Sequence, residues 1–213
     1  MSCIVACTVK ESGERGCGVL LKSDTVGTGR STQMHYVNPK IFSVPLNNGA
    51  GQSIATIGLG VSGSWRVGQV AQQALSDWRT TETPDTWTTS HTQQYVIQHI
   101  IPVLRNALED VNCISNDSTS ENKGARMLLG LCGTLMIIQR DFSVLIPQNG
   151  IAAIGSGFQY ARGAMHAHMK EGSVFHQQTY EIDEASALLD AGLDAAIHNH
   201  PNVAGSTIRI LAT

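Results

Sequence analysis

The stretch Met1-Ser2-Cys3-Ile4-Val5-Ala6-Cys7-Thr8-Val9 opens the chain with an uncharged run, rich in β-branched residues, that predicts a strand. It lacks the basic start and the long apolar run of a secretory signal peptide. If Met1 is removed, Ser2 carries a hydroxyl nucleophile and a free α-amine on one residue. Because an α-amine titrates near about pH 8, much of it is unprotonated at neutral pH and can serve as the base that a hydroxyl nucleophile needs. The plainer interpretation is an ordinary Met-Ser start before a strand.

The composition suits one compact domain over residues 1–213, since 42% of the chain is hydrophobic and 15% is charged. The net charge of −3 gives no electrostatic case for binding nucleic acid. No apolar run approaches the roughly 18 residues of a membrane span, so no membrane contact is expected. The five cysteines form no CxxC pair, which indicates a reducing compartment without a zinc site or a disulfide framework. They are Cys3, Cys7, Cys17, Cys113 and Cys132.

Strands dominate the first third of the chain, where apolar runs alternate with glycine- and serine-rich stretches. We expect strands over 3–9, 17–24, 38–45 and 53–61, with a loop or a weak hairpin over 25–37. Glycine recurs inside the last of these strands, a feature that indicates close approach of a ligand or of another chain.

From Ser64 onward the apolar residues recur at helical spacing, which predicts helices over 64–78 and 95–108, with Pro102 as a kink or a start. The remaining elements expected are a β-hairpin formed by 126–138 with 140–146, a strand over 151–154, helices over 158–169 and 182–197, and a closing strand over 206–211. Strand runs that alternate with helix pairs predict an α+β fold in which the helix pairs cover two mainly antiparallel sheets, giving four layers.

Five segments follow one another in an order typical of one known family. The most specific is Ile151-Ala152-Ala153-Ile154-Gly155-Ser156-Gly157-Phe158-Gln159-Tyr160-Ala161, which is similar to the family's Ile-Ala-Ile-Gly-Ser-Gly-x-x-Tyr-Ala. The other four are 2–5, 21–24, 38–41 and 58–63, and the spacing between Asp24 and Lys40 is also the family's. On these residues the chain resembles the proteasome-like N-terminal nucleophile (Ntn) hydrolases, and most closely the HslV-type peptidases of bacteria and phages. The resemblance implies an αββα sandwich over 1–213.

The resemblance implies that Ser2, once Met1 is removed, attacks a peptide carbonyl. Lys40 would lie near the Ser2 hydroxyl, lower its pKa and stabilise developing negative charge. Asp24 would pair with Lys40, because a buried ammonium without a partner is costly. Ser2 departs from the family's threonine, which keeps the hydroxyl but loses the methyl group that restricts χ1.

Three further residues receive roles in the same way. The N–H of Gly60 is the candidate oxyanion donor, since glycine lets a substrate backbone come close. Ser156 would hydrogen-bond near the terminal amine; alternatively, Gly155-Ser156-Gly157 is only a tight turn with a helix N-cap. Asp194 is matched to a family aspartate near the site.

Histidines give no sign of a metal centre. His166 and His168 are two residues apart, as are His198 and His200, so the members of each pair do not share a helix face. No carboxylate pattern accompanies them, and we expect neither a metal nor another cofactor.

The resemblance implies a peptidase subunit that assembles into a homo-oligomeric ring in the cytoplasm of a bacterium or of a phage-infected host. Its substrates would be peptides or unfolded proteins, and an ATPase unfoldase is a candidate partner. The alternative is a non-catalytic structural or assembly subunit of the same fold, for example in a phage particle, with Met1 retained. A third interpretation is an amidohydrolase that acts on a small amide. The presence of Ser2, Asp24, Lys40 and Ser156 together favours the peptidase.

Overall fold

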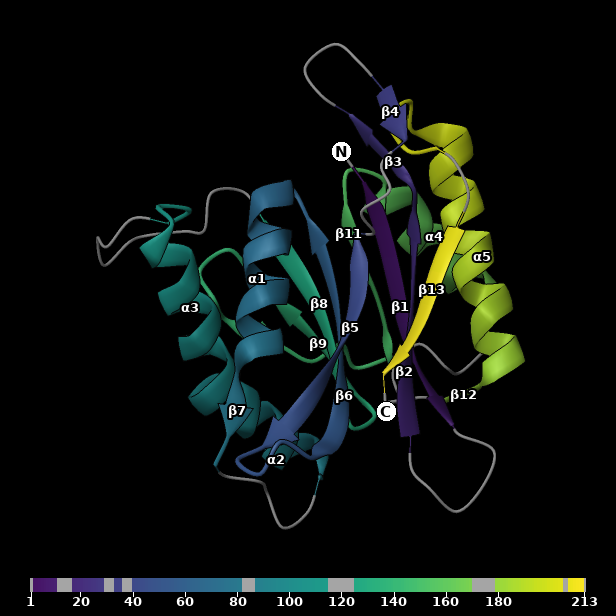
Figure 1. Ribbon diagram of the computed structural model, residues 1–213. Helices are drawn as coiled ribbons and strands as arrows, with labels where there is room; N and C mark the ends of the chain where they lie inside the picture. Colours follow the sequence, from purple (N-terminus) through teal and green to yellow (C-terminus); the bar gives the residue numbers. More distant parts are fainter. Residues whose placement is uncertain are drawn as a thin grey trace.

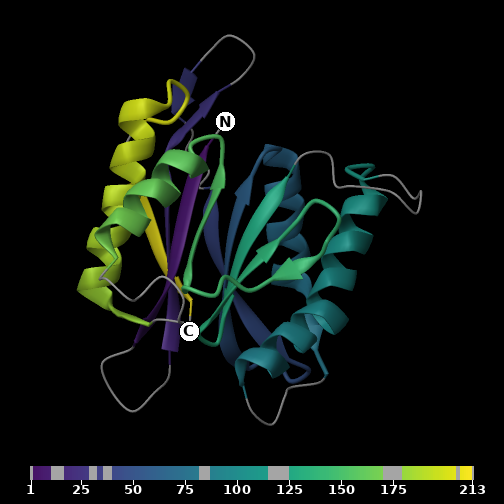
Figure 2. The ribbon, with the colours of Figure 1, turned by 180° about the vertical axis from the view of Figure 1, so that it is seen from behind.

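Two sheets lie face to face between two layers of helices (Figures 1 and 2). This computed structural model describes residues 2–10, 17–28, 33–35, 40–81, 87–114, 125–169, 179–204 and 207–212. The four layers confirm the α+β sandwich that the order of elements predicts. Among the described residues, no helix is long and apolar enough to cross a membrane.

The first sheet has the strand order β11-β1-β2-β13 and holds the N-terminal strand near its centre. Its strands are β1 (Cys3–Lys10), β2 (Cys17–Asp24), β11 (Ile151–Gly155) and β13 (Thr207–Ala212), with the short β12 (Tyr180–Glu181) paired to β1. Helices α4 (Phe158–His168) and α5 (Ile182–Asn199) cover its outer face (Figure 1). Every residue of β1 except Lys10 is buried, because layers cover the strand on both faces, and this accounts for the absence of charged residues from Cys3 to Val9.

The second sheet has the strand order β10-β9-β8-β6-β5-β7. Its strands are β5 (Ile41–Asn48), β6 (Ser53–Ser62), β7 (Arg79–Thr80), β8 (Arg126–Leu131), β9 (Thr134–Ile138) and β10 (Val144–Leu145). The helices on this side are α1 (Trp65–Asp77), α2 (Thr89–Tyr95), the π-helical η1 (Val96–Ile100) and α3 (Ile101–Asp110). The short strands β3 (Val26–Thr28) and β4 (Gln33–His35) pair separately, which confirms the weak hairpin predicted over 25–37.

Three clusters of buried apolar side chains fill the spaces between the four layers. One lies between the first sheet and its helices, one between the second sheet and its helices, and one between the two sheets. The cluster between the sheets contains Ile4, Leu21 and Ile41 and is closely packed at two glycines. A Cβ atom added to Gly58 would lie 2.8 Å from Ala212 Cβ, and one added to Gly130 would lie 2.7 Å from Val19 Cβ. The absence of these two side chains allows the sheets to approach.

Two predicted elements differ from the structure. The hairpin lies within 126–138, because Cys132 and Gly133 both adopt positive φ and turn the chain from β8 into β9. The segment predicted to return as its second strand contributes only β10. The helix expected over 95–108 begins earlier, at Thr89, and Pro102 lies in the first turn of α3 directly after η1. Residues 38 and 39 of the predicted strand 38–45 lie outside the described part of the chain.

The topology brings four chain segments to one end of the sandwich. They are the start of β1, the end of β2, the residue before β5 and the end of β11. Cys3 pairs with Gly155, and Ile4 pairs with Ser23, so the N-terminal residue of the described chain lies between β2 and β11. The N-terminus is marked at this end in Figure 1.

Candidate active site

Asp24 connects the N-terminal strand to Lys40. Its Oδ1 atom accepts a hydrogen bond from the backbone N–H of Cys3 at 2.8 Å and another from Lys40 Nζ at 2.7 Å. Both side chains are almost inaccessible to water, since Asp24 is 0% exposed and Lys40 is 4% exposed. A buried, charge-assisted pair of this kind fixes both groups in place. Asp24 therefore holds Lys40 beside the residue that follows Met1.

Burial and pairing act in opposite directions on this pair. Burial raises the pKa of the Asp24 carboxyl, and the Lys40 charge and the N–H of Cys3 oppose that rise. Burial lowers the pKa of Lys40, and Asp24 opposes that fall. Burial, reinforced by the Asp24 charge, also raises the pKa of the Cys3 thiol to about 12, so Cys3 stays a neutral thiol at physiological pH. Lys40 is thus the group of this set that can lose its charge below the usual lysine range.

Ser2 is held by its backbone carbonyl. Ser156 Oγ donates a hydrogen bond to the Ser2 carbonyl oxygen at 3.3 Å, and the N–H of Gly157 approaches the same oxygen at 3.5 Å. Gly157, and not Ser156, occupies the N-cap position of α4. Ser156 is therefore placed to orient Ser2 and does not serve as the helix cap. Gly155 has φ of +97°, and a Cβ atom there would collide with the Ser2 carbonyl.

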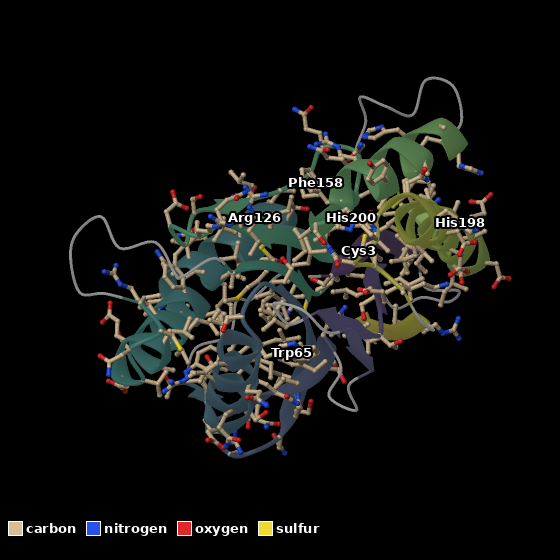
Figure 3. The ribbon with its side chains drawn as sticks, turned by 90° about the horizontal axis from the view of Figure 1, so that it is seen from above. Cys3, Trp65, Arg126, Phe158, His198 and His200 are labelled. Carbon is tan, nitrogen blue, oxygen red and sulfur yellow. The ribbon has the colours of Figure 1, made fainter. Side chains whose placement is uncertain are left out.

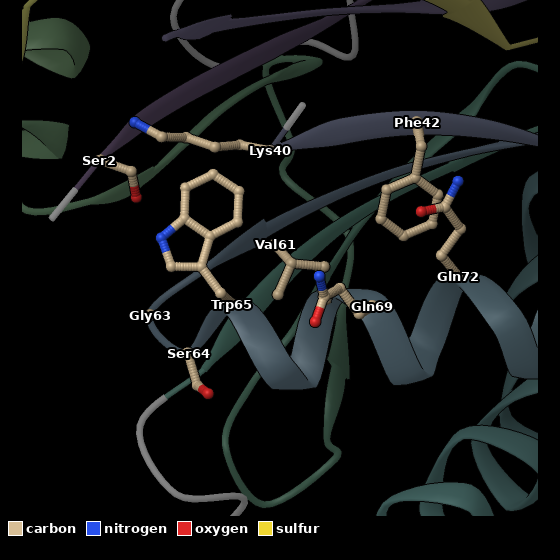
Figure 4. A pocket seen from close by; sticks show the side chains of 10 residues that line it. Ser2, Lys40, Phe42, Val61, Gly63, Ser64, Trp65, Gln69 and Gln72 are labelled. Atoms are coloured by element: carbon tan, nitrogen blue, oxygen red, sulfur yellow. The ribbon is translucent and has the colours of Figure 1, made fainter. Parts of the chain in front are cut away.

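A pocket of about 250 Å³ opens beside Ser2 (Figure 4). Its lining at the Ser2 end comes from three places: the residue before β1, the residue before β5, and the β6–α1 junction. The residues there are Ser2, Lys40, Gly63 and Trp65, whereas Phe42 lies at the other end of the pocket. In Figure 4 the Lys40 side chain reaches toward Ser2, and the indole of Trp65 lies between Ser2 and Val61. A substrate bound in this pocket would have its reacting group near both Ser2 and Lys40.

Two residues singled out from the sequence lie elsewhere. Gly60 faces the space between the sheets, where an added Cβ atom would lie 2.9 Å from Ile4 and 3.3 Å from Ile41. Gly60 does not line the pocket, whereas Gly63 does. Asp194 is exposed on α5, and its backbone carbonyl contacts His198 Nδ1 at 2.8 Å. The four residues that the structure brings to the site are therefore Ser2, Asp24, Lys40 and Ser156.

The pocket residues Phe42 and Trp65, and the tight contact at Gly155, were not assigned to the site from the sequence. Trp65 fits the apolar spacing of α1 and was therefore indistinguishable from a core position. The apolar Phe42 likewise fits a buried strand. Gly155 was part of a recognised segment, but only the positive φ reveals why a side chain is not tolerated there.

Histidines and cysteines form no metal centre in the part of the chain that the structure describes, where no group of three or more His, Cys, Asp or Glu is placed to hold an ion. Figure 3 shows His198 and His200 at the end of α5, away from Trp65 on α1. The ring of His200 lies edge-on to Tyr160, with 6.4 Å between the ring centres. All five cysteines are free thiols.

Comparison with known proteins gives matches in structure. No family model and no curated protein sequence matches the chain. BPH from Thiobacillus denitrificans matches with a TM-score of 0.64 at 17% identity, covering 98% of this chain and 96% of that one. HslV from Trypanosoma brucei matches with a TM-score of 0.60 at 15% identity, covering 98% of each. Anbu from Yersinia bercovieri, an ancestral β-subunit, matches with a TM-score of 0.67 at 12% identity, covering 99% of this chain and 81% of that one.

These matches extend over nearly the whole of this chain, and their low identities limit what they show to the fold. The arrangement of the two sheets, the central N-terminal strand and the helix pairs agrees with the resemblance to HslV-type proteins that the sequence motifs carry. The chain therefore has the proteasome-like fold of the Ntn hydrolases.

Proposed function

We propose that this chain is a peptidase subunit of the proteasome-like type, in which Ser2 becomes the N-terminal nucleophile after Met1 is removed. The observation that carries this proposal is the arrangement of Ser2 and Lys40 in one pocket, with Asp24 bridging Lys40 to the start of β1. The fold brings these groups together because it places the start of the chain in the middle of a sheet, between β2 and β11.

In the proposed reaction, Ser2 Oγ attacks the carbonyl carbon of a peptide bond while its proton passes, through water, to the Ser2 α-amine. The C–N bond then breaks, the proton moves to the leaving amine, and an ester on Ser2 remains. A water molecule hydrolyses that ester and restores the free hydroxyl. The Lys40 ammonium stabilises negative charge as it develops, and Asp24 keeps the ammonium in position.

The oxyanion donor in this proposal is the N–H of Gly63 and not that of Gly60. Gly63 lines the pocket, has φ of +114° and lies at the turn between β6 and α1. The substrate can approach closely there because no side chain intervenes. The N–H of Val61, which also lines the pocket, is already donated to the Lys40 carbonyl at 2.9 Å.

The encoded Met1 decides between two functions of the same fold. When Met1 is retained, the Ser2 nitrogen is an amide and cannot accept a proton. The chain would then be a non-catalytic structural or assembly subunit. A free Ser2 amine would make the peptidase chemistry available.

Assembly is proposed from the structural relatives. Anbu from Pseudomonas aeruginosa has been solved as a helical assembly of its complex. We propose that this chain also forms a homo-oligomer, of which a closed ring is one form, and that it acts on peptides or unfolded proteins in the cytoplasm of a bacterium or a phage-infected host. An ATPase unfoldase is the proposed partner for folded substrates.

The test combines intact mass with turnover. We expect the purified protein to lack the mass of one methionine and to cleave unstructured peptides. Ser2→Ala should abolish cleavage, leaving the oligomeric mass measured by light scattering unchanged. Ser2→Thr is the matched variant, because it keeps a hydroxyl and should retain activity. Turnover by Ser2→Ala at the wild-type rate would remove Ser2 as the nucleophile.

An inhibitor gives a second readout at the same residue. BPH from Thiobacillus denitrificans has been solved in complex with epoxomicin. We expect epoxomicin to add its mass to this chain once Met1 is absent, with peptide mapping placing the addition on Ser2. Protein that retains Met1, and the Ser2→Ala variant, should stay unmodified. Full-length protein of unchanged mass, with no cleavage and no adduct, would favour the non-catalytic subunit.

A further inference from the structure

The pocket beside Ser2 continues along one face of α1. Phe42 and Val61, both less than 10% exposed, form its floor, and the exposed Gln69 and Gln72 form its rim. Figure 4 shows both glutamine side chains on the helix wall, with Gln72 beside Phe42. At about 250 Å³ the pocket is smaller than the roughly 300–1,000 Å³ that accommodate drug-sized ligands. It therefore suits one side chain of a bound peptide.

The pocket is lined almost entirely by uncharged side chains. Of the residues that line it, Lys40 alone is charged, and Asp24 balances that charge through the 2.7 Å contact. The wall and floor offer an indole, a phenyl ring and a valine, and the rim offers two neutral carboxamides. A charged side chain placed here would lose its hydration without gaining a counter-ion, whereas an uncharged one would not.

We propose that this pocket selects a peptide with a long, uncharged side chain, methionine or glutamine, on the acyl side of the cleaved bond. This inference rests on the proposed function of Ser2. The apolar stem of such a side chain packs between Trp65 and Val61. Its tip reaches the carboxamides of Gln69 and Gln72, which can donate to and accept from a neutral polar group.

Gly68 sets how much room the side chain has. It lies on α1 between Trp65 and Gln72 and lines the pocket. A Cβ atom added to Gly68 would lie 3.6 Å from Val61 Cβ, an ordinary van der Waals contact. Gly68→Ala therefore fits without strain and narrows the pocket by one methyl group. Since alanine is also the better helix former, the variant should fold at least as stably as wild type.

The experiment uses two pairs of substrates with matched length and different charge. Methionine is compared with lysine, and glutamine with glutamate, at the acyl position of otherwise identical fluorogenic peptides. We expect kcat/KM to be at least about tenfold higher for the neutral member of each pair. Gln72→Glu should raise the relative rate for lysine. Equal rates within each pair, or a preference for the charged member, would overturn the proposal.

Gly68→Ala tests the size of the pocket. We expect it to lower kcat/KM for methionine relative to alanine by about three- to tenfold, since one methyl group changes the fit. Gly163→Ala is the matched control, because Gly163 lies on α4 with open space around its Cβ position. The control should leave the ratio of kcat/KM for methionine to kcat/KM for alanine unchanged. A ratio that does not change in Gly68→Ala contradicts the assignment of this pocket.

A binding measurement separates this inference from the proposed function. In Ser2→Ala, acetylated tripeptide amides ending in methionine, lysine, glutamine or glutamate are titrated while Trp65 fluorescence is recorded. Trp65→Phe should remove the signal, since Trp78 and Trp87 lie near Tyr95 and do not line the pocket. Binding about tenfold tighter for the neutral peptides supports the inference even if no peptide is cleaved, in which case only the peptidase function fails. Equal binding overturns the inference even if peptides are cleaved.

Discussion

Asp24 carries a buried negative charge that is balanced by the positive charge of Lys40. Its Oδ1 atom contacts both Lys40 and the N–H of Cys3, and both charged side chains are almost inaccessible to water. The free energy of transferring two charges from water is large, so such a pair stabilises the fold only while it is complete. Removing one charge leaves the other buried without compensation.

We therefore expect Asp24→Asn to lower the free energy of unfolding by about 3–5 kcal/mol. Asparagine can still accept the hydrogen bond from Cys3, so the loss reports on the charge of Lys40. Denaturant unfolding measures it. Glu109→Gln is the control, since the Glu109–Arg105 pair is partly exposed and should contribute less than about 1 kcal/mol. Adding Lys40→Met to Asp24→Asn should restore part of the stability, and a double variant that is weaker by the sum of both losses would contradict this account.

The lowered pKa of Lys40 has a consequence for the pH dependence of the proposed peptidase activity. A lysine with a lowered pKa becomes neutral at a lower pH than an exposed lysine, for which the pKa is about 10.4. As the pH rises, the rate should first increase because the Ser2 amine loses its proton. It should then decrease as Lys40 loses its charge, and this decrease should begin at a pH below about 10.4. Profiles of kcat/KM against pH, recorded for protein without Met1, measure both limbs.

Lys40→Arg separates Lys40 from other alkaline effects. A guanidinium keeps its charge throughout this range, so the fall in rate at alkaline pH should shift to higher pH, even if the maximal rate is lower. An alkaline limb at the same pH in both proteins would show that another group controls it.

At the scale of elements, the periodicity of apolar residues predicted the strands and helices whose positions depend on local sequence. The N-terminal strand β1, the glycine-rich β6 and the helix α5 are found where the sequence placed them, within a few residues. The hairpin in 126–138 was misassigned because its turn residue Cys132 adopts a positive φ, which is uncommon for cysteine and leaves no signal in the sequence. The early start at Thr89 was missed because Thr88, which caps α2 by accepting from the N–H of His91, lies in a polar stretch.

The end of β11 gives a prediction at this scale. Gly155 pairs with Cys3 and has φ of +97°, and a side chain there would collide with the Ser2 carbonyl. We expect Gly155→Ala to destabilise the protein by about 1–3 kcal/mol and to reduce peptide cleavage through displacement of Ser2. Thermal and denaturant unfolding measure the first effect. Gly163→Ala, in an open position on α4, should instead be neutral or stabilising by up to about 1 kcal/mol. A Gly155→Ala protein as stable and active as wild type would exclude this constraint.

At the scale of the whole molecule, the sequence led to part of the site. Asp24 and Lys40 lie at strand ends whose order the resemblance supplied, and the structure brings them into contact. Gly60 was selected from the glycine-rich segment 58–63 because a glycine admits a substrate backbone, and the strand alternation that turns it toward Ile4 depends on register. Asp194 lies on an exposed face of α5, and which face a helix presents depends on the packing of the layers. The pocket could not be predicted because α1, β5 and β6 form it jointly.

The packing of the two sheets gives the last prediction. Gly130 of β8 faces Val19 of β2 across the space between the sheets, and an added Cβ atom would lie 2.7 Å from Val19 Cβ. We expect Gly130→Ala to destabilise the protein by about 1–3 kcal/mol, because the sheets must separate to admit one methyl group.

Val19→Ala alone should also destabilise the protein, because it leaves a cavity. In the double variant the new methyl group occupies space that Val19 has vacated. The double variant should therefore be more stable than the sum of the single losses predicts, by at least about 1 kcal/mol in a double-mutant cycle. Losses that simply add would mean that this contact does not set the distance between the sheets.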